Sequence, residues 1–240
     1  PAGAVVIFSA HGISPAVRRE AKERGLRALD ATCPLVTKVH LEALRYAKRG
    51  YSIVLIGHRD HVEVQGTLGE APDAIVVVES VEDVERLEVK DPSRVAYISQ
   101  TTLSVDDVRT IVEALKRRFP LVHEPAKADI CYATQNRQDA VKQLLEHCGL
   151  LVVVGSKSSS NSNRLRELAD RAGVPGYLVD GASDLKREWF SGIEAVGVTA
   201  GASAPEQLVQ EVVARLREWG GAPPAESYGK PENVVFALPR

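Results

Sequence analysis

Two of the three cysteines in the sequence stand where a thiolate would be stabilised. Cys33, in DATCPLVTKVH, precedes Pro34, and proline suits the first position of a helix, so Cys33 is expected at or near the N-cap. Cys131, in ADICYATQNRQDAV, has a similar setting between a short apolar step and a helical pattern. A helix N-terminus favours the thiolate, which can be a nucleophile or a metal ligand. The alternative for Cys33 is a small buried apolar side chain.

The third cysteine, Cys148 in LLEHCGLLVVVG, has a different setting. It falls near a predicted helix C-terminus and beside a buried strand, so we interpret it as structural. Three scattered cysteines are an odd number, which argues against a disulfide framework and for reduced thiols.

A second group of candidate residues lies in the stretch GHRDHVE. His58, His61 and Glu63 have a spacing that suggests zinc, although zinc signatures usually place their histidine pair on one helix face and this stretch follows a strand. In a second interpretation, His61 donates to an anion while Glu63 moves a proton. A solvated loop with incidental histidines is the third.

Four further polar side chains have simple structural explanations when each is taken alone. His11, in FSAHG, is a lone histidine at a strand end, and Thr101 and Thr102, in SQTT, are typical of helix caps. Ser203 and Glu206 are spaced as a capping box, which predicts that Ser203 caps a helix. A serine hydroxyl can accept from the backbone and still donate to a ligand.

The stretch LLVVVGSKSSSNSNRL, residues 150–165, places a cluster of serines and asparagines between an apolar run and a helical pattern. Uncharged donors beside the N-H groups of a helix N-terminus form a cradle for an anion such as phosphate. The sequence has neither a Walker A loop nor a G-x-G-x-x-G motif, so ATP in a P-loop and NAD in a dinucleotide fold are not expected. The residues of this cluster are Ser156, Ser158, Ser159, Ser160, Asn161, Ser162 and Asn163.

Short β-branched runs alternate with amphipathic segments, which predicts parallel sheets covered by helices. Ser14 before Pro15 and Ser104 before Asp107 mark helix starts. Each polar motif follows the carboxyl end of a predicted strand, where α/β sheets bind ligands, so the motifs are expected to converge on one site. The expected strands are residues 4–8, 52–57, 74–79, 95–99, 150–155, 177–180, 195–200 and, after a loop, 234–238.

Composition narrows the range of partners. The 240 residues carry a formal net charge of -2, so no basic field for nucleic acid or an anionic membrane is expected. No apolar run approaches the roughly 20 residues that span a bilayer, and no signal-like segment opens the chain. These features predict a cytoplasmic protein with a small-molecule ligand.

Taken in order, the motifs resemble those of the LytB family, the 4-hydroxy-3-methylbut-2-enyl diphosphate reductases of the non-mevalonate isoprenoid pathway. The motifs are FSAHG, DATCPLVTKVH, GH.DH.E..GT, SQTTLSVDD, DICYATQNRQ.AV, VVGSKSSSNSNRL and GVTAGASAPE. The resemblance implies three similar α/β lobes around a central iron-sulfur cluster. We expect residues 1–33 to be the remainder of an incomplete first lobe, 34–130 and 131–217 to form the second and third lobes, and 218–240 to return to the first.

The resemblance also implies roles for the residues. Cys33 and Cys131 match two of the three ligands of a [4Fe-4S] cluster, and Glu63 matches the proton-delivering carboxylate. The implied reaction removes the allylic hydroxyl with two electrons and two protons, giving isopentenyl and dimethylallyl diphosphate, with a ferredoxin- or flavodoxin-type electron donor. Diphosphate binding is implied for His11, His61, Ser159, Ser160, Asn161 and Ser203, and a place near the substrate hydroxyl for Thr101.

The sequence departs from the family pattern at two points. The family's first cysteine and a following histidine have no counterpart here, so we expect an N-terminally truncated chain with an incomplete first lobe and no stable catalytic cluster. Val62 stands where the family usually has proline. The alternatives are a cluster-free diphosphate-binding remnant and, from the stretch GHRDHVE, a zinc-dependent hydrolase.

Overall fold

The computed structural model describes residues 1–224, 229–230 and 232–237, and its strands form three small, entirely parallel sheets. The α/β class with parallel sheets is therefore confirmed. The chain divides into two compact units. Residues 1–131, with the described part of 234–240, hold the first two sheets, and residues 132–233 hold the third.

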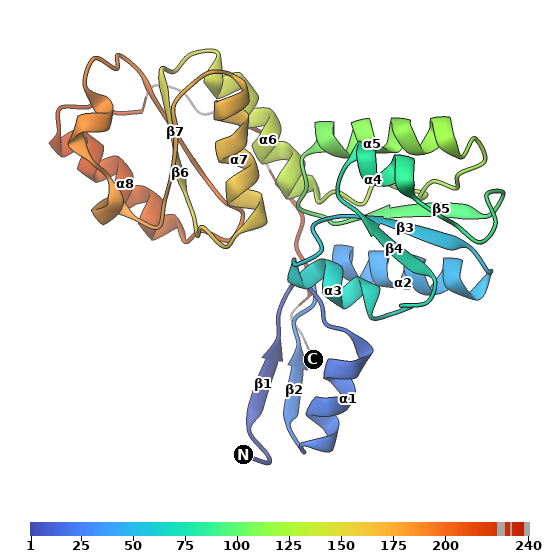
Figure 1. The fold of residues 1–240 in the computed structure, drawn as a ribbon. Coiled ribbons are helices and arrows are strands. Elements are labelled where there is room, and N and C mark those ends of the chain that lie inside the picture. The colour runs from blue at the N-terminus through green and yellow to red at the C-terminus, as the bar shows by residue number, and fades with distance from the viewer. Residues whose placement is uncertain (225–228, 231, 238–240) are drawn as a thin grey trace. The chain divides into compact units, whose positions relative to one another are not determined.

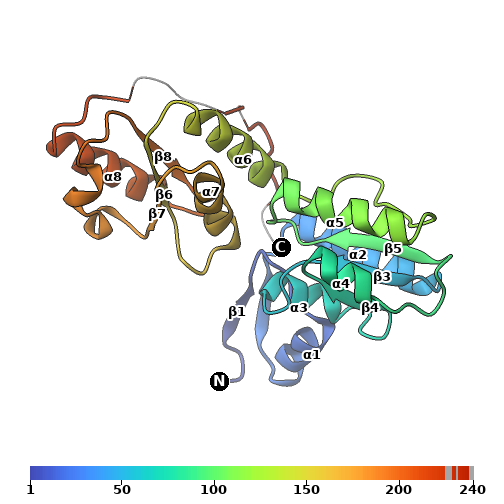
Figure 2. The same cartoon turned by 45° about the horizontal axis from the view of Figure 1, so that its top comes forward.

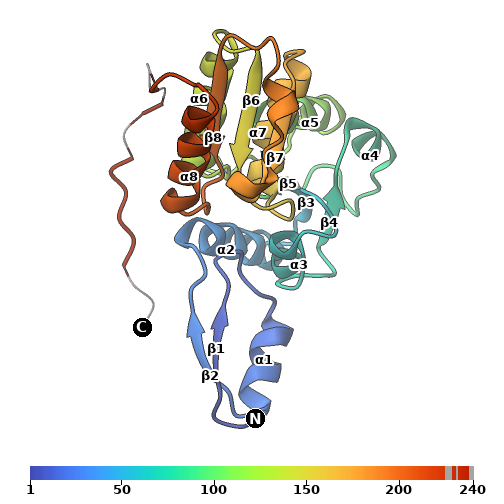
Figure 3. The same ribbon diagram turned by 90° about the vertical axis from the view of Figure 1, so that its left-hand side faces the viewer.

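The first sheet has two strands. β1 (Val5–Phe8) pairs in parallel with β2 (Arg27–Asp30), and α1 (Pro15–Glu23) connects them. Figure 3 shows α1 running alongside the pair. The sequence predicts β1 but not β2, because the RALD segment is short and two of its four residues are charged. Three of the four residues are exposed in the structure.

The second sheet has β3 (Ser52–Ile56) between two parallel neighbours, and helices cover both faces (Figure 1). Successive side chains of a strand point to opposite faces. Ile53 and Leu55 accordingly pack in the cluster that includes α2 and α3, whereas Val54 and Ile56 pack in the cluster that includes α4 and α5. The other elements of this sheet are β4 (Ile75–Val78), β5 (Val95–Ser99), α2 (Pro34–Lys48), α3 (Val62–Leu68), α4 (Val81–Arg86) and α5 (Val105–Arg118).

The third sheet is built in the same way around β6 (Leu150–Val154), all five residues of which are buried. A strand covered on both faces is apolar throughout, and LLVVV has that composition. Figure 2 shows α6 and α7 on one side of this sheet and α8 on the other. The remaining elements are β7 (Gly176–Val179), β8 (Val196–Ala200), α6 (Tyr132–Leu145), α7 (Ser160–Arg171), η1 (Ala182–Asp184), η2 (Arg187–Phe190) and α8 (Glu206–Glu218).

Two of the three predicted helix caps are confirmed. Ser14 Oγ accepts from the backbone N-H of Val17, and Ser104 Oγ accepts from that of Asp107. The predicted capping box at Ser203 is wrong, because α8 begins only after Pro205. A residue that precedes proline is disfavoured in the helical region, so Ala204 cannot readily open the helix and Ser203 lies in a turn instead.

The predicted last strand is also wrong for the residues that the structure describes. Residues 234–237 form no strand, and Val235 is 92% exposed, as expected of a segment without a ladder partner. Leu238 lies outside the described residues. The division into three lobes and a returning tail stays a prediction. None of the described helices combines the length and the apolarity that crossing a membrane requires.

Candidate active site

Glu63 is the most deeply buried of the predicted site residues, with 2% of its surface exposed. It lies in the first turn of α3, where its Oε1 accepts from the backbone N-H of Thr101 at 2.6 Å and its Oε2 accepts from the Thr101 hydroxyl at 3.0 Å. Burial raises the pKa of Glu63 to about 7, although both hydrogen bonds from Thr101 act in the opposite direction. A carboxyl with such a pKa can give up or take a proton near neutral pH.

Thr101 follows the carboxyl end of β5, and its hydroxyl does not cap a helix, since Ser104 is the cap of α5. The neighbouring Thr102 accepts from Gln100 Nε2 at 2.8 Å. Thr101 is therefore not a helix cap. Its backbone N-H and its hydroxyl both donate to Glu63.

His61 is the N-cap of α3, and its Nδ1 accepts from the backbone N-H of Glu63 at 3.2 Å. An accepting Nδ1 carries no proton, so the neutral ring holds its proton on Nε2 and can donate from there. The ring of His11 lies edge-on to it, with centroids 5.6 Å apart. Burial, followed by the charges of His11 and His58, lowers the pKa of His61 to about 4.

Gly12 fixes the loop that carries His11. Its φ of +79° is in the left-handed region, which glycine adopts without strain. A Cβ at this position would lie 3.0 Å from Val36 and 3.1 Å from His40, both on α2. The loop after β1 therefore packs closely against α2, and a larger residue would displace it.

The predicted zinc ligands do not assemble. His58 Nδ1 lies 3.6 Å from Glu79, His61 Nδ1 accepts from the backbone, and both oxygens of Glu63 are held by Thr101. Within residues 1–224, 229–230 and 232–237, no group of three or more His, Cys, Asp or Glu side chains is arranged to hold a metal ion. The interpretation with a proton-moving Glu63 and an anion-binding His61 fits this geometry better.

Cys33 and Cys131 both lie at helix starts, as the sequence predicts. Cys33 is the N-cap of α2 and its side chain makes no capping hydrogen bond, while its backbone N-H donates to Ala10. Cys131 directly precedes α6, and its backbone N-H donates to the carbonyl of Thr101 at 2.9 Å. Both side chains are half-buried.

Cys148 lies three residues beyond the end of α6, in the unit of residues 132–233. Burial raises the pKa of its thiol, and its Sγ is so close to Gly197 that a Cβ there would lie 2.9 Å away. This packing supports the structural interpretation.

An ionic group with buried carboxyls joins α2 to the segment before Cys131, and no sequence motif predicts it. Lys38 Nζ lies 2.7 Å from Asp129 Oδ1 and 3.5 Å from Glu42 Oε2, and the two carboxyls are almost completely buried. Burial and the charge of Asp129 raise the pKa of Glu42, while Lys38 acts against both. The only sequence signal is the presence of opposite charges within the motifs of Cys33 and Cys131.

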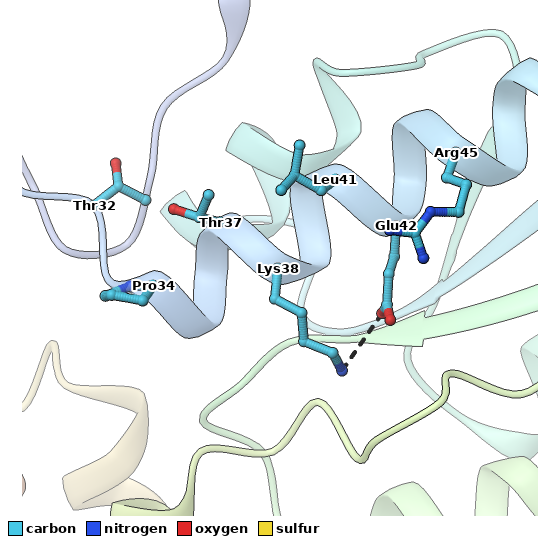
Figure 4. Close-up of a pocket in the computed structure, with 7 residues that line it drawn as sticks. All are labelled: Thr32, Pro34, Thr37, Lys38, Leu41, Glu42 and Arg45. Carbon is cyan, nitrogen blue, oxygen red and sulfur yellow. Dashed lines mark ion pairs between the residues drawn. The ribbon is translucent and has the colours of Figure 1, made fainter. Parts of the chain in front are cut away.

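A cavity of about 390 Å³ runs along α2 and reaches Thr32, the residue before Cys33 (Figure 4). It does not include Glu63 or the histidines. Its lining residues are Thr32, Pro34, Thr37, Lys38, Leu41, Glu42 and Arg45.

The predicted anion cradle belongs to the unit of residues 132–233. Ser159 is the N-cap of α7 and accepts from the backbone N-H of Ser162, and Ser160 is the first residue of the helix. Asn161 is buried, and its Oδ1 accepts from the backbone N-H of Ala202 at 2.9 Å. That bond ties the start of α7 to the turn that holds Ser203.

Much of the remaining polar cluster stabilises the loop itself. Asn163 Nδ2 donates to the carbonyls of Lys157 and Ser159, and the hydroxyls of Ser156 and Ser158 lie 2.9 Å apart. The density of serines and asparagines therefore overstates the number of groups that are available to a ligand.

Comparison with known proteins identifies the family to which the chain belongs. The protein-family model described as LytB protein matches residues 2–217. The chain is 59% identical to the 4-hydroxy-3-methylbut-2-enyl diphosphate reductase of Hahella chejuensis and 57% identical to that of Ectopseudomonas mendocina; these matches cover the whole chain and 77% and 78% of the relatives.

The solved structure of the E-1-hydroxy-2-methyl-but-2-enyl-4-diphosphate reductase from Plasmodium falciparum superimposes with a TM-score of 0.92 at 41% identity, over the whole chain and 76% of that protein. The family model and these relatives agree, and the chain belongs to the LytB family.

Proposed function

We propose that this chain provides the proton donor, the diphosphate-binding groups and two cluster ligands of a 4-hydroxy-3-methylbut-2-enyl diphosphate reductase. The reaction replaces the allylic C-O bond with a C-H bond: two electrons and two protons are consumed, and water leaves. The products are isopentenyl and dimethylallyl diphosphate. The buried pair of Glu63 and Thr101, next to the imidazole pair, is the observation that carries the proposal.

Glu63 supplies a proton through Thr101. The backbone N-H of Thr101 keeps Oε1 as an acceptor, so the proton of the neutral carboxyl resides on Oε2. That carboxyl then donates to the Thr101 hydroxyl, which rotates and presents its own hydrogen to the substrate's hydroxyl. Protonation of this oxygen makes it a better leaving group, and Glu63 becomes a carboxylate again accepting from Thr101.

The proposal assigns diphosphate-binding roles to the histidines and, in the unit of residues 132–233, to the serine-rich start of α7. His61 donates from Nε2, and His11 stands beside it. Ser159, Ser160, Asn161 and Ser203 lie near a helix N-terminus and in the turn tied to it, where N-H groups favour an anion. Hydrogen bonds to a charged acceptor are worth about 1.5–3 kcal/mol each. Micromolar binding corresponds to about 8 kcal/mol in addition to the cost of association, so the proposal needs several such bonds acting together.

The sulfur atoms of Cys33 and Cys131 fit an iron-sulfur cluster in chemical type, since thiolates are the usual ligands of such clusters. When bound, a [4Fe-4S] cluster would relay the two electrons, which a ferredoxin- or flavodoxin-type protein in the cytoplasm would supply. Cys33 is half-buried and makes no side-chain capping bond, which leaves its sulfur available as a ligand. Cys148 is packed against Gly197 and is not proposed as a ligand.

Iron loading and ligand binding together test the proposal. The 240-residue chain is incubated anaerobically with iron, sulfide and an added thiol, and iron and sulfide are counted while substrate affinity is measured by calorimetry. We expect the chain to retain iron only when Cys33 and Cys131 are both present. We also expect the substrate to bind only when it carries its diphosphate group. Diphosphate binding without such iron would instead indicate a cluster-free binding protein, and stoichiometric zinc would indicate a hydrolase.

A further inference from the structure

Lys38 donates to two acceptors in the segment before Cys131 and lies near a carboxylate of its own helix. Its Nζ donates to Asp129 Oδ1 at 2.7 Å and to the carbonyl of Lys127 at 2.6 Å, and it lies 3.5 Å from Glu42 Oε2. Figure 4 shows the side chain of Lys38 leaving α2 on the side of Glu42. One ammonium group therefore joins α2 to the segment that leads to Cys131.

Asp129 is fixed from its other side as well. Its Oδ2 accepts from the backbone N-H of Ser99, the last residue of β5, at 2.9 Å. Two residues later, the N-H of Cys131 donates to the carbonyl of Thr101. The segment from Asp129 to Cys131 is thus bound along the end of β5, and the Asp129 side chain meets α2 at Lys38 and at Glu42.

We propose that Lys38 and Asp129 are positioning residues that set the separation of the sulfur atoms of Cys33 and Cys131. Cys33 lies five residues before Lys38, about 7.5 Å along the helix axis. Cys131 lies two residues after Asp129, at most about 7 Å away. Asp129 is almost completely buried and Lys38 is partly buried, so the ion pair is largely protected from water.

This inference rests on the proposed function, because the separation matters only if both sulfur atoms ligate one group. The spacing itself can nevertheless be measured without iron. Nitroxide labels are attached to Cys33 and Cys131 in a Cys148→Ser background, and their separation is measured by dipolar EPR on frozen samples.

The variants are chosen so that the chain stays folded. Lys38→Met alone would leave Asp129 and Glu42 as buried carboxyls without their cation. It is therefore combined with Glu42→Gln and with Asp129→Asn, which keeps an acceptor for Ser99. Asp129→Asn alone is the milder second variant. The matched control is Lys116→Met with Glu124→Gln, which removes an ion pair of 2.8 Å that is about half exposed.

The distribution of label separations is expected to broaden and shift to longer values in the triple variant, less so in Asp129→Asn, and not in the control. An unchanged distribution in either folded Asp129 variant would overturn the inference. Broadening equal to that of the control would overturn it too. If the distances shift but no iron binds to wild-type protein, the proposed function fails and the positioning role stands.

Discussion

Thr101 donates both its backbone N-H and its hydroxyl to the buried carboxyl of Glu63, at 2.6 and 3.0 Å. The two carboxyl oxygens of Glu63 therefore have different hydrogen-bonding roles. One is held permanently as an acceptor, and the other can exchange a proton with a hydroxyl that is able to rotate. Burial keeps a substantial fraction of this carboxyl protonated near neutral pH.

Replacing Glu63 with Gln is expected to leave the dissociation constant of the substrate nearly unchanged and to lower turnover by about 10²–10⁴-fold, because the amide has the shape of the carboxyl but cannot supply a proton. Turnover is measured anaerobically with a chemical electron donor, and binding by calorimetry. Glu70→Gln, which changes a carboxyl bound to His40, is the control and is expected to alter neither quantity. Equal losses of binding and turnover in Glu63→Gln would exclude the proposed role.

Thr101→Val removes the hydroxyl but keeps the backbone N-H and a similar shape. Turnover is expected to fall, and because a bond that lowers the pKa of Glu63 is lost, the alkaline limb of the pH profile is expected to move to higher pH. Thr101→Ser keeps the hydroxyl and should retain the wild-type limb. An identical limb in the Val and Ser variants would mean that the hydroxyl does not communicate with Glu63.

Stability should also depend on Glu63. Its pKa is raised from 4.5 to about 7 in the folded chain, so the folded state binds more protons than the unfolded state between these values. Stability from this group is therefore present below pH 4.5 and is lost as pH rises through about 7, by about 3 kcal/mol. The lowered pKa of His61 acts in the opposite direction between about 4 and 6.5.

Glu63→Gln should therefore gain stability relative to wild type as the pH is raised from 5 to 8. Urea unfolding at both values measures the gain, and the His61 contribution cancels because both proteins contain it. A stability difference that is the same at the two pH values would contradict the raised pKa.

The start of α7 gives a prediction for the anion cradle. A Cβ at Gly201 would overlap Ser162 Oγ, so Gly201→Ala should displace α7 and weaken diphosphate binding. The same Cβ would lie 3.4 Å from Ser162 Cβ, so adding Ser162→Ala, which removes the hydroxyl, should restore the affinity. Gly181→Ala is the control, since its Cβ would meet Leu208 at an ordinary 3.8 Å. Failure of the second change to rescue binding would refute this packing.

Local patterns are enough to predict most of the fold, but some features depend on neighbours that local patterns do not show. The apolar run LLVVV predicts the buried strand β6 without other information, because a strand covered on both faces must be apolar. The β2 strand is exposed and polar, and it exists because β1 offers it a partner. Ser203 fails as a cap because Pro205 restricts the residue before it.

The same distinction applies to the site. Cys33 and Glu63 are identified by their motifs. Cys33 lies at a helix start, as the following Pro34 predicts, whereas the sequence does not predict the helix whose first turn contains Glu63. The pairing of Lys38 with Asp129 joins residues 91 positions apart, and its burial is created by the packing of α2 on the sheet. No spacing rule within either motif predicts it.

Iron and sulfide counting, with EPR after reduction, on the wild-type chain and on three single Cys→Ser variants is the decisive test of the shared thiolate site. Without added thiol, the wild-type chain should hold less than a full [4Fe-4S] cluster, because it offers two suitable ligands. With added thiol, Cys33→Ser and Cys131→Ser should each abolish iron retention and the EPR signal, whereas Cys148→Ser should match the wild type. Retention of iron by the Cys33 and Cys131 variants, or its loss in the Cys148 variant, would contradict the proposed site.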